Sequence, residues 1–186
     1  PGDISDQVQE YRNQLVESAA ENDEELMERF FEGGDLSHED LIKGLKIGIH
    51  NASLAPVFCC AAASKGGVPS LMDTIVRFMP APNEVAPRKG QKSNGEEAEC
   101  LCDENSPFAA QVFKTVTDNF VGKISLFKIY SGKVKAGDSV YNPSAEKSEK
   151  VSTVYYMRGK KTYPIEEGLF AGDIGAFAKM QTVSTG

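Results

Sequence analysis

A regular alternation of glycine turns and short apolar stretches near the C-terminus constrains the fold of this chain most. Its clearest part is the run F-V-G-K-I-S-L-F-K-I-Y-S-G-K-V-K-A-G-D at 120–138. Residues 124–130 are rich in β-branched and aromatic side chains, which suit a half-buried strand. The tripeptide A-G-D ends this run and returns at 171–173. Because glycine adopts positive φ without steric cost and aspartate can bond its own backbone, each copy predicts a turn between strands.

Short strands are expected to dominate from Phe108 to the end of the chain, after one candidate strand at 98–102. The stretches that predict strands are 98–102, 109–116, 124–130, 139–141, 150–157 and 174–180, with a turn over 103–107. Strands at these intervals favour a small antiparallel barrel or sandwich. Its aromatic residues alternate with polar ones, so we expect core packing rather than an RNA-stacking surface. These residues are Phe108, Phe113, Phe120, Phe127, Tyr130, Tyr141, Tyr155 and Tyr156.

The first 82 residues follow the period of helices instead. A first helix is expected from Ile4, with Asp3 as its cap and one apolar stripe. The stripe consists of Ile4, Val8, Tyr11, Leu15 and Ala19. A second helix, capped by Asn22 or Asp23, is expected to end at Gly33 and Gly34. Its buried side is expected to hold Leu26, Met27, Phe30 and Phe31.

A third helix is expected to open at Ser37. Ser37 and Asp40 have the spacing of a capping box, with aspartate in place of the usual glutamate or glutamine. Gly44 and Gly48 weaken this helix, but they allow another segment to pack closely against it. The three helices together predict a helical first part of the chain.

Proline marks the elements that follow this helical part. The apolar stretch 54–60 predicts a strand that either lies at a sheet edge or starts at Pro56. Pro69 is expected in the first turn of a fourth helix, which stops at Pro80. The stretch 81–95, rich in proline, lysine, asparagine and glycine, predicts a linker or exposed loop.

Composition is that of a soluble globular protein, but the charge is unevenly divided. Of the 186 residues, 40% are hydrophobic and 25% are charged. No apolar run reaches the roughly 20 residues of a membrane-spanning helix, so no membrane partner is expected. Residues 1–43 hold 13 acidic and 3 basic side chains, whereas 107–186 hold 7 acidic and 11 basic ones. The basic excess permits contact with phosphate, and a merely solvated lysine-rich surface is the alternative.

The four cysteines are expected to be free thiols without a metal or catalytic role. Cys59 is next to Cys60, and Cys100 is two residues before Cys102, neither of which is the spacing of a structural zinc site. Cys59 and Cys60 lie in the predicted strand 54–60, where a free cysteine behaves as a small buried hydrophobe. Reduced thiols indicate a cytoplasmic protein, with a metal or redox role as the alternative.

One ordered set of residues in the C-terminal part carries a family resemblance. Its members are Phe113, Lys114, Asp118, Val121, Gly122, Lys123, Tyr130, Ser131, Gly132, Gly137, Asp138, Tyr141, Asn142, Met157, Ala171, Gly172 and Asp173. In this order and at these intervals they resemble the second domain of bacterial elongation factor G, the translocation GTPase of the ribosome. Residues 17–20, 24–28, 56–57 and 80–82 are similar to the end of the GTPase domain in that family.

The resemblance implies an α+β fold in a piece of a longer protein, with a processed mature chain as the alternative. Residues 1–82 would be the C-terminal part of the GTPase domain with its helical insertion. Residues 83–106 would be a linker and first barrel strand, and 107–186 the translation-factor β-barrel. The chain has no G-x-x-x-x-G-K-[ST], D-x-x-G or N-K-x-D motif. Since these motifs hold the phosphates, magnesium and base, this chain alone should not hydrolyse GTP, and GTP with Mg²⁺ belongs to the intact parent.

The resemblance also implies two kinds of contact residue. The family's guanine-binding loop reads roughly G-S-A, and its counterpart here is Cys60, Ala61 and Ala62. A tight turn from a strand into a helix is the alternative reason for these small residues.

The second domain of the family contacts small-subunit ribosomal RNA and relays the nucleotide state. The implied contact candidates are Lys114, Lys123, Lys128 and Lys133. Lys123 is favoured because it adjoins the turn at Gly122. The piece is expected to be monomeric.

Several alternatives stay open at this point. One is that the parent is a related ribosome-protection or release-type GTPase, or a duplicate elongation factor G. Another is a free-standing β-barrel interaction module with a helical appendage, which would have no link to translation.

Overall fold

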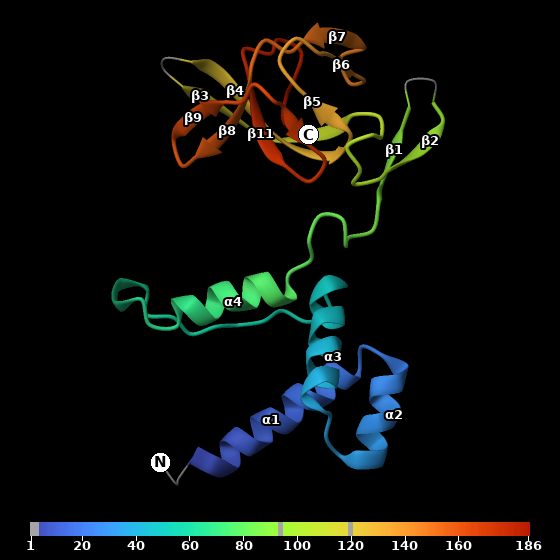
Figure 1. Ribbon diagram of the computed structural model, residues 1–186, viewed down its shortest axis with the longest axis vertical. Helices are drawn as coiled ribbons and strands as arrows, with labels where there is room; N and C mark the ends of the chain where they lie inside the picture. Colours follow the sequence, from blue (N-terminus) through green and yellow to red (C-terminus); the bar gives the residue numbers. More distant parts are fainter. Residues whose placement is uncertain (1–3, 93–94, 119–120) are drawn as a thin grey trace. The chain divides into compact units, whose positions relative to one another are not determined.

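The computed structural model describes residues 4–92, 95–118 and 121–186, which form helices followed by antiparallel strands (Figure 1). The chain divides into two compact units, Pro1–Pro80 and Ala81–Gly186. This order of elements confirms the α+β class expected from the sequence. None of the helices within the described residues is both long and apolar enough to cross a membrane.

Among the described residues, the helical unit contains α-helices and a short 3-10 helix. They are α1 (Ser5–Ala20), α2 (Glu24–Gly33), α3 (His38–His50), η2 (Ala62–Ser64) and α4 (Val68–Phe78). The expected caps are present on α2 and α3, where the Asp23 side chain accepts from the Leu26 N–H and Ser37 accepts from the Asp40 N–H, each at 3.1 Å. Gly34 ends α2 at φ 72°, and Pro69 lies in the first turn of α4. The proposed cap Asp3 lies outside the described residues.

A small apolar core joins the first three helices. Its buried members are Val16, Ala19, Ala20, Leu36 and Leu41. Helix α1 packs against both α2 and α3 (Figure 1). The approach between α1 and α3 is close at Gly44, where an added Cβ would lie 2.4 Å from the carbonyl oxygen of Ala19. Close packing at this glycine is therefore confirmed.

The burial expected for two helix faces is wrong in part. The stripe on α1 is buried only at Ala19, whereas Ile4, Val8, Tyr11 and Leu15 are exposed. On α2, Leu26 is fully buried but the Phe31 side chain is 78% exposed. Periodicity predicts which residues share a face, but burial also requires a neighbour, and within the described residues α1 finds one only near its C-terminal end.

The strand expected at 54–60 is wrong. This stretch pairs with no other strand of the described chain, and only Ala61 forms a bridge, with Gly66. Cys59 and Cys60 are exposed rather than buried. A strand is defined by its ladder partners, so an apolar run without neighbours stays extended and open to solvent.

The second unit is built around one five-stranded antiparallel sheet, with strand order β3-β4-β11-β8-β9. Three two-stranded ribbons accompany it, pairing β1 with β2, β5 with β10 and β6 with β7. The strands of the large sheet are β3 (Ala109–Asp118), β4 (Gly122–Ser131), β8 (Val154–Arg158), β9 (Lys161–Pro164) and β11 (Ile174–Ala178). The strands of the ribbons are β1 (Arg88–Gln91), β2 (Glu97–Cys100), β5 (Lys133–Val134), β6 (Ser139–Asn142), β7 (Lys147–Lys150) and β10 (Leu169–Phe170).

The core of this unit forms between the sheet and the ribbons. Phe127 on β4 stacks on Phe177 of β11, with ring centroids 3.9 Å apart and an interplanar angle of 17°. The other buried members are Ile129, Val134, Val151, Val154, Leu169, Met180 and Val183. Phe127 and the half-buried Phe108 fit the expectation of core aromatics, but Phe113 and Tyr141 are exposed, and Phe120 lies outside the described residues.

Both A-G-D tripeptides form the turns that the sequence predicts, with the same hydrogen bond. Gly137 has φ 94° and Gly172 has φ 97°. The Asp138 side chain accepts from the Lys135 N–H, and the Asp173 side chain accepts from the Phe170 N–H, each at a distance of 2.9 Å. The aspartate therefore closes the turn on the backbone three residues earlier.

Some strand predictions are wrong in detail. Residues 150–157 form the end of β7 and the start of β8 rather than one strand, and the region expected as a linker contains β1. Strand β1 pairs with β2 through Arg88 opposite Cys100 and Gln91 opposite Glu97. Its sequence R-K-G-Q has no apolar alternation, because all four residues are exposed.

The carboxylate of Glu149 fastens the C-terminal segment to β7. It accepts hydrogen bonds from the Gln181 N–H at 2.6 Å, the Thr182 N–H at 3.0 Å and the Thr182 hydroxyl at 2.7 Å. Burial raises the pKa of Glu149, but these three donors, with the attraction of Lys123, hold the pKa below its ordinary value.

We expect Gly44→Ala to destabilise the helical unit by about 1–3 kcal/mol, since the new methyl group meets the Ala19 carbonyl. Chemical denaturation followed by circular dichroism at 222 nm measures the change. Gly33→Ala is the matched control, because a Cβ at this helical glycine meets nothing within 4 Å. Equal stability of the two variants would contradict the close packing of α1 on α3.

We expect Glu149→Gln to lower the stability of the second unit by about 2 kcal/mol at pH 7, because an amide replaces a charged acceptor. The folded pKa lies below the unfolded one of about 4.3, so this stabilisation is present above the unfolded pKa and is lost as pH falls through the folded pKa. The gap between wild type and variant should therefore close in acid.

Urea denaturation followed by tyrosine fluorescence measures the effect of Glu149→Gln. The chain has no tryptophan and 6 tyrosines, of which only Tyr11 lies in the helical unit. A gap between wild type and variant that stayed constant from pH 7 to pH 3 would contradict the role of the Glu149 charge.

Candidate functional site

The loop 60–66 forms a compact hairpin between the extended stretch and α4. The Ala61 N–H donates to the Gly66 carbonyl at 2.9 Å, and the Gly66 N–H donates back at 3.1 Å. The carbonyl of Ala61 also accepts from the Ser64 N–H at 3.1 Å and from the Ser64 hydroxyl at 3.2 Å. These four hydrogen bonds connect Ala61 with Ser64 and Gly66 within the loop.

The loop leaves two backbone donors open. Ala62 and Ala63 begin a 3-10 helix, and the first N–H groups of a helix have no acceptor within it. No backbone acceptor for either N–H is found among the described residues, and both residues are exposed. The Ala61 N–H, in contrast, is engaged by Gly66, and the side chains of Cys60, Ala61 and Ala62 offer no strong donor. Recognition of a base here would therefore depend on the backbone at Ala62 and Ala63.

The four lysine candidates have different surroundings. Lys123, the favoured one, lies half-buried on β4 and donates its ammonium to the carbonyl of Val183. It thereby helps to hold the C-terminal segment and lies near the Glu149 carboxylate. An ammonium group has three donors, so two remain for other acceptors. Sequence reasoning could not find this contact, because 60 residues separate the two partners.

Lys114 and Lys133 are exposed on separate strands. Lys114 lies beside a register shift in β3, between Val112 and Lys114, and is opposite Leu126 of β4. Lys133 begins the short strand β5, opposite Phe170 of β10. These two lysines therefore lie on different strand pairs, β3 with β4 and β5 with β10.

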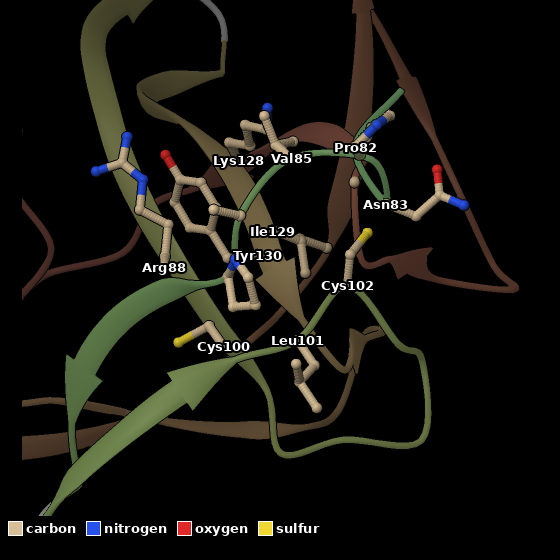
Figure 2. Close-up of a pocket in the computed structure, with 13 residues that line it drawn as sticks. Pro82, Asn83, Val85, Arg88, Cys100, Leu101, Cys102, Lys128, Ile129 and Tyr130 are labelled. Carbon is tan, nitrogen blue, oxygen red and sulfur yellow. The ribbon is translucent and has the colours of Figure 1, made fainter. Parts of the chain in front are cut away.

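Lys128 lies in different surroundings, at a cavity around Tyr130. Its Nζ is 5.8 Å from the centroid of the Tyr130 ring, and the Arg88 guanidinium carbon is 5.0 Å from the same centroid. Figure 2 shows the tyrosine ring between the two cationic side chains. The cavity has a volume of about 450 Å³ and lies within the second unit. Sequence reasoning missed Arg88 and Tyr130 as partners, since β1 was expected to be a linker.

A second cationic and aromatic group occupies the β8–β9 hairpin. Tyr156 and Tyr163 stack across the strands with centroids 5.0 Å apart, and the Arg158 guanidinium carbon lies 5.3 Å and 5.8 Å from their centroids. The signal in the sequence is the run M-R-G-K-K, which places three basic residues around the turn at Gly159.

Within the described ranges, no three His, Cys, Asp or Glu side chains come close enough together to hold a metal ion. The four cysteines are free thiols, of which Cys100 and Cys102 are half-buried. The chemistry that these groups offer is hydrogen bonding and charge neutralisation toward anions.

Residues 107–186 match the family model of elongation factor G domain 2. The whole chain is also similar to a protein from Thermus thermophilus of known crystal structure, with 27% identity and a TM-score of 0.72. This match covers 100% of the chain and 25% of the Thermus protein, so the chain spans about a quarter of that protein's length. The family match confirms the resemblance inferred from the order of residues in the C-terminal part.

Proposed function

We propose that this chain is the ribosome-docking piece of a translational GTPase, because its residues 107–186 match the family model of elongation factor G domain 2. In this role the β-barrel binds the ribosome and passes the nucleotide state of the GTPase domain to it. The parent would drive the GTP-dependent translocation of tRNA and mRNA in the cytoplasm.

The similarity across the helical unit supports this proposal over a free-standing β module. The match to the Thermus protein runs through the entire chain and not only through the barrel. Residues 1–82 would then be the end of the GTPase domain, residues 83–106 a connection with the first barrel strand, and 107–186 the docking barrel.

The residues present fit only one part of a bound GTP. The open N–H groups of Ala62 and Ala63 can donate to the guanine carbonyl oxygen, and the rigid hairpin around Ala61 holds them in place. Nothing in the described chain fits the phosphates, because it has neither a phosphate loop nor an acidic cluster for Mg²⁺. GTP and Mg²⁺ would therefore be bound mainly by another part of the parent, and magnesium there would neutralise phosphate charge.

Contact with small-subunit ribosomal RNA would rest on lysine charge. The exposed side chains of Lys114 and Lys133 and the half-buried Lys128 can reach phosphates directly. Lys123 would contribute through the donors that Val183 leaves unused.

We expect this chain alone to release no phosphate from GTP above the rate of a buffer blank. Catalysis of phosphoryl transfer depends on a phosphate-binding loop and Mg²⁺, and this sequence has no such loop. A phosphate-release assay with and without Mg²⁺ measures this, with an intact translational GTPase as the positive control. GTP hydrolysis that co-eluted with the chain on a second column would refute the proposal that this chain is not catalytic alone.

We expect replacement of Lys114, Lys128 and Lys133 by glutamine to weaken binding to small ribosomal subunits. Each lysine that neutralises a phosphate should also change the slope of log K against log salt by roughly 0.7–0.9. Sedimentation at several salt concentrations measures both quantities.

Lys147→Gln is the matched control for this series, because it removes the same charge from the exposed strand β7. An equal loss of affinity in this control would show that binding follows net charge rather than the proposed contacts. Unchanged affinity in all three candidate variants would refute the RNA contact.

A further inference from the structure

The cavity around Tyr130 belongs to the second unit, whereas loop 60–66, the proposed guanine loop, belongs to the helical unit. It forms where the segment before β1 and the end of β2 pass over the outer face of β4 (Figure 2). Its volume of about 450 Å³ falls within the usual range of roughly 300–1,000 Å³ for small-molecule sites.

The charged lining of this cavity is entirely cationic. Among the residues that the structure describes, Arg88 and Lys128 are the charged ones that line it, and no aspartate or glutamate does. Neither cation forms an ion pair within the described part of the chain. The Tyr130 ring attracts both cations through its π face, which orients them while leaving their N–H groups free to donate.

The rest of the lining is apolar with a few polar atoms. The apolar wall includes Pro82, Val85 and Leu101. Figure 2 shows the Asn83 amide and the Cys102 thiol at one end, away from Arg88. The cavity therefore has an anion-attracting end and an apolar end.

We propose that this cavity binds a nucleoside monophosphate. A phosphate monoester carries nearly two negative charges and three acceptor oxygens, which match the Arg88 guanidinium, the Lys128 ammonium and the Tyr130 hydroxyl. The flat apolar body of a base fits against Val85 and Leu101. The Asn83 amide both donates and accepts, as a ribose hydroxyl requires. This ligand goes beyond the proposed ribosome docking, which needs no small molecule.

The first test is calorimetric titration of the full chain with AMP, adenosine and inorganic phosphate. AMP is the probe because the guanine loop has no reason to bind adenine, so failure here leaves the proposed function untouched. We expect AMP to bind at one site per chain. Adenosine and phosphate should each bind at least tenfold more weakly, since each engages only one end of the cavity.

The second test uses variants of the anion-binding end. Arg88→Gln should weaken AMP binding about tenfold, as the loss of a charged hydrogen bond does. Tyr130→Phe keeps the ring and removes only the hydroxyl, so it should weaken binding less. Lys147→Gln removes a lysine charge elsewhere in the same unit and should leave AMP affinity unchanged. Thermal denaturation of each variant verifies that it is folded.

A third readout is protection of the Cys102 thiol, which lines the cavity. AMP should slow its alkylation at least fivefold, measured by peptide mass spectrometry. The exposed Cys59 and Cys60 are internal controls that AMP should not affect.

Three results would overturn the proposal. They are no saturable binding of AMP up to 10 mM, binding of phosphate or adenosine as tight as that of AMP, or AMP affinity unchanged by Arg88→Gln. Alkylation of Cys102 unaffected by saturating AMP would place any binding site elsewhere and would equally refute it.

Discussion

The contact of Phe127 with Phe177 organises the second unit, because it joins the two strands on which the others depend. Strand β4 pairs with β3 on one side and β11 on the other, and β11 then pairs with β8. The two stacked rings lie at the centre of the buried cluster. Replacing either ring by alanine would open a cavity at the junction of three strands, which in well-packed cores costs about 3–5 kcal/mol.

The same strand connects the core to the candidate sites. Successive side chains of β4 point to opposite faces, so Phe127 and Ile129 enter the core while Lys128 and Tyr130 face outward. A slip of one residue in the register would bury the charge of Lys128 and expose both apolar side chains. Core packing therefore determines the positions of the Lys128 ammonium and the Tyr130 ring at the cavity.

Glycine permits the close approaches around this strand. At Gly132 an added Cβ would lie 2.6 Å from the carbonyl oxygen of Ser106, and its φ is 73°. This turn receives the segment 103–107, whose Asp103 carbonyl accepts from the Gly132 N–H at 2.9 Å. The turn expected at 103–107 thus packs against Gly132, a contact that local sequence patterns do not show. The same contact positions the end of β2 at the cavity.

Sequence reasoning was most successful where the physical signal is local. Helix caps, the A-G-D turns and the strands with apolar alternation depend on neighbouring residues, and Asp23, Ser37 and Gly137 behave as expected. Burial on α1 and the contact of Lys123 with Val183 depend on distant parts of the chain, and neither could be predicted. Strand β1 was missed because its four residues are exposed and its pairing with β2 uses only the backbone.

The exposed apolar residues of the helical unit have a physical interpretation under the proposed function. The Val57 side chain is 90% exposed and that of Val76 is 83% exposed, and α4 has no buried residue at all. Full burial of each of these valine side chains would stabilise the protein by about 1.5–3 kcal/mol. A large contiguous apolar patch marks an interaction site, whereas single exposed apolar residues do not. If residues 54–60 belong to the sheet of a GTPase domain, neighbouring strands would complete the ladder and α4 would cover them. The hydrogen bonds between Ala61, Ser64 and Gly66 are then significant, because they keep the donors of Ala62 and Ala63 in position whether or not those strands are present.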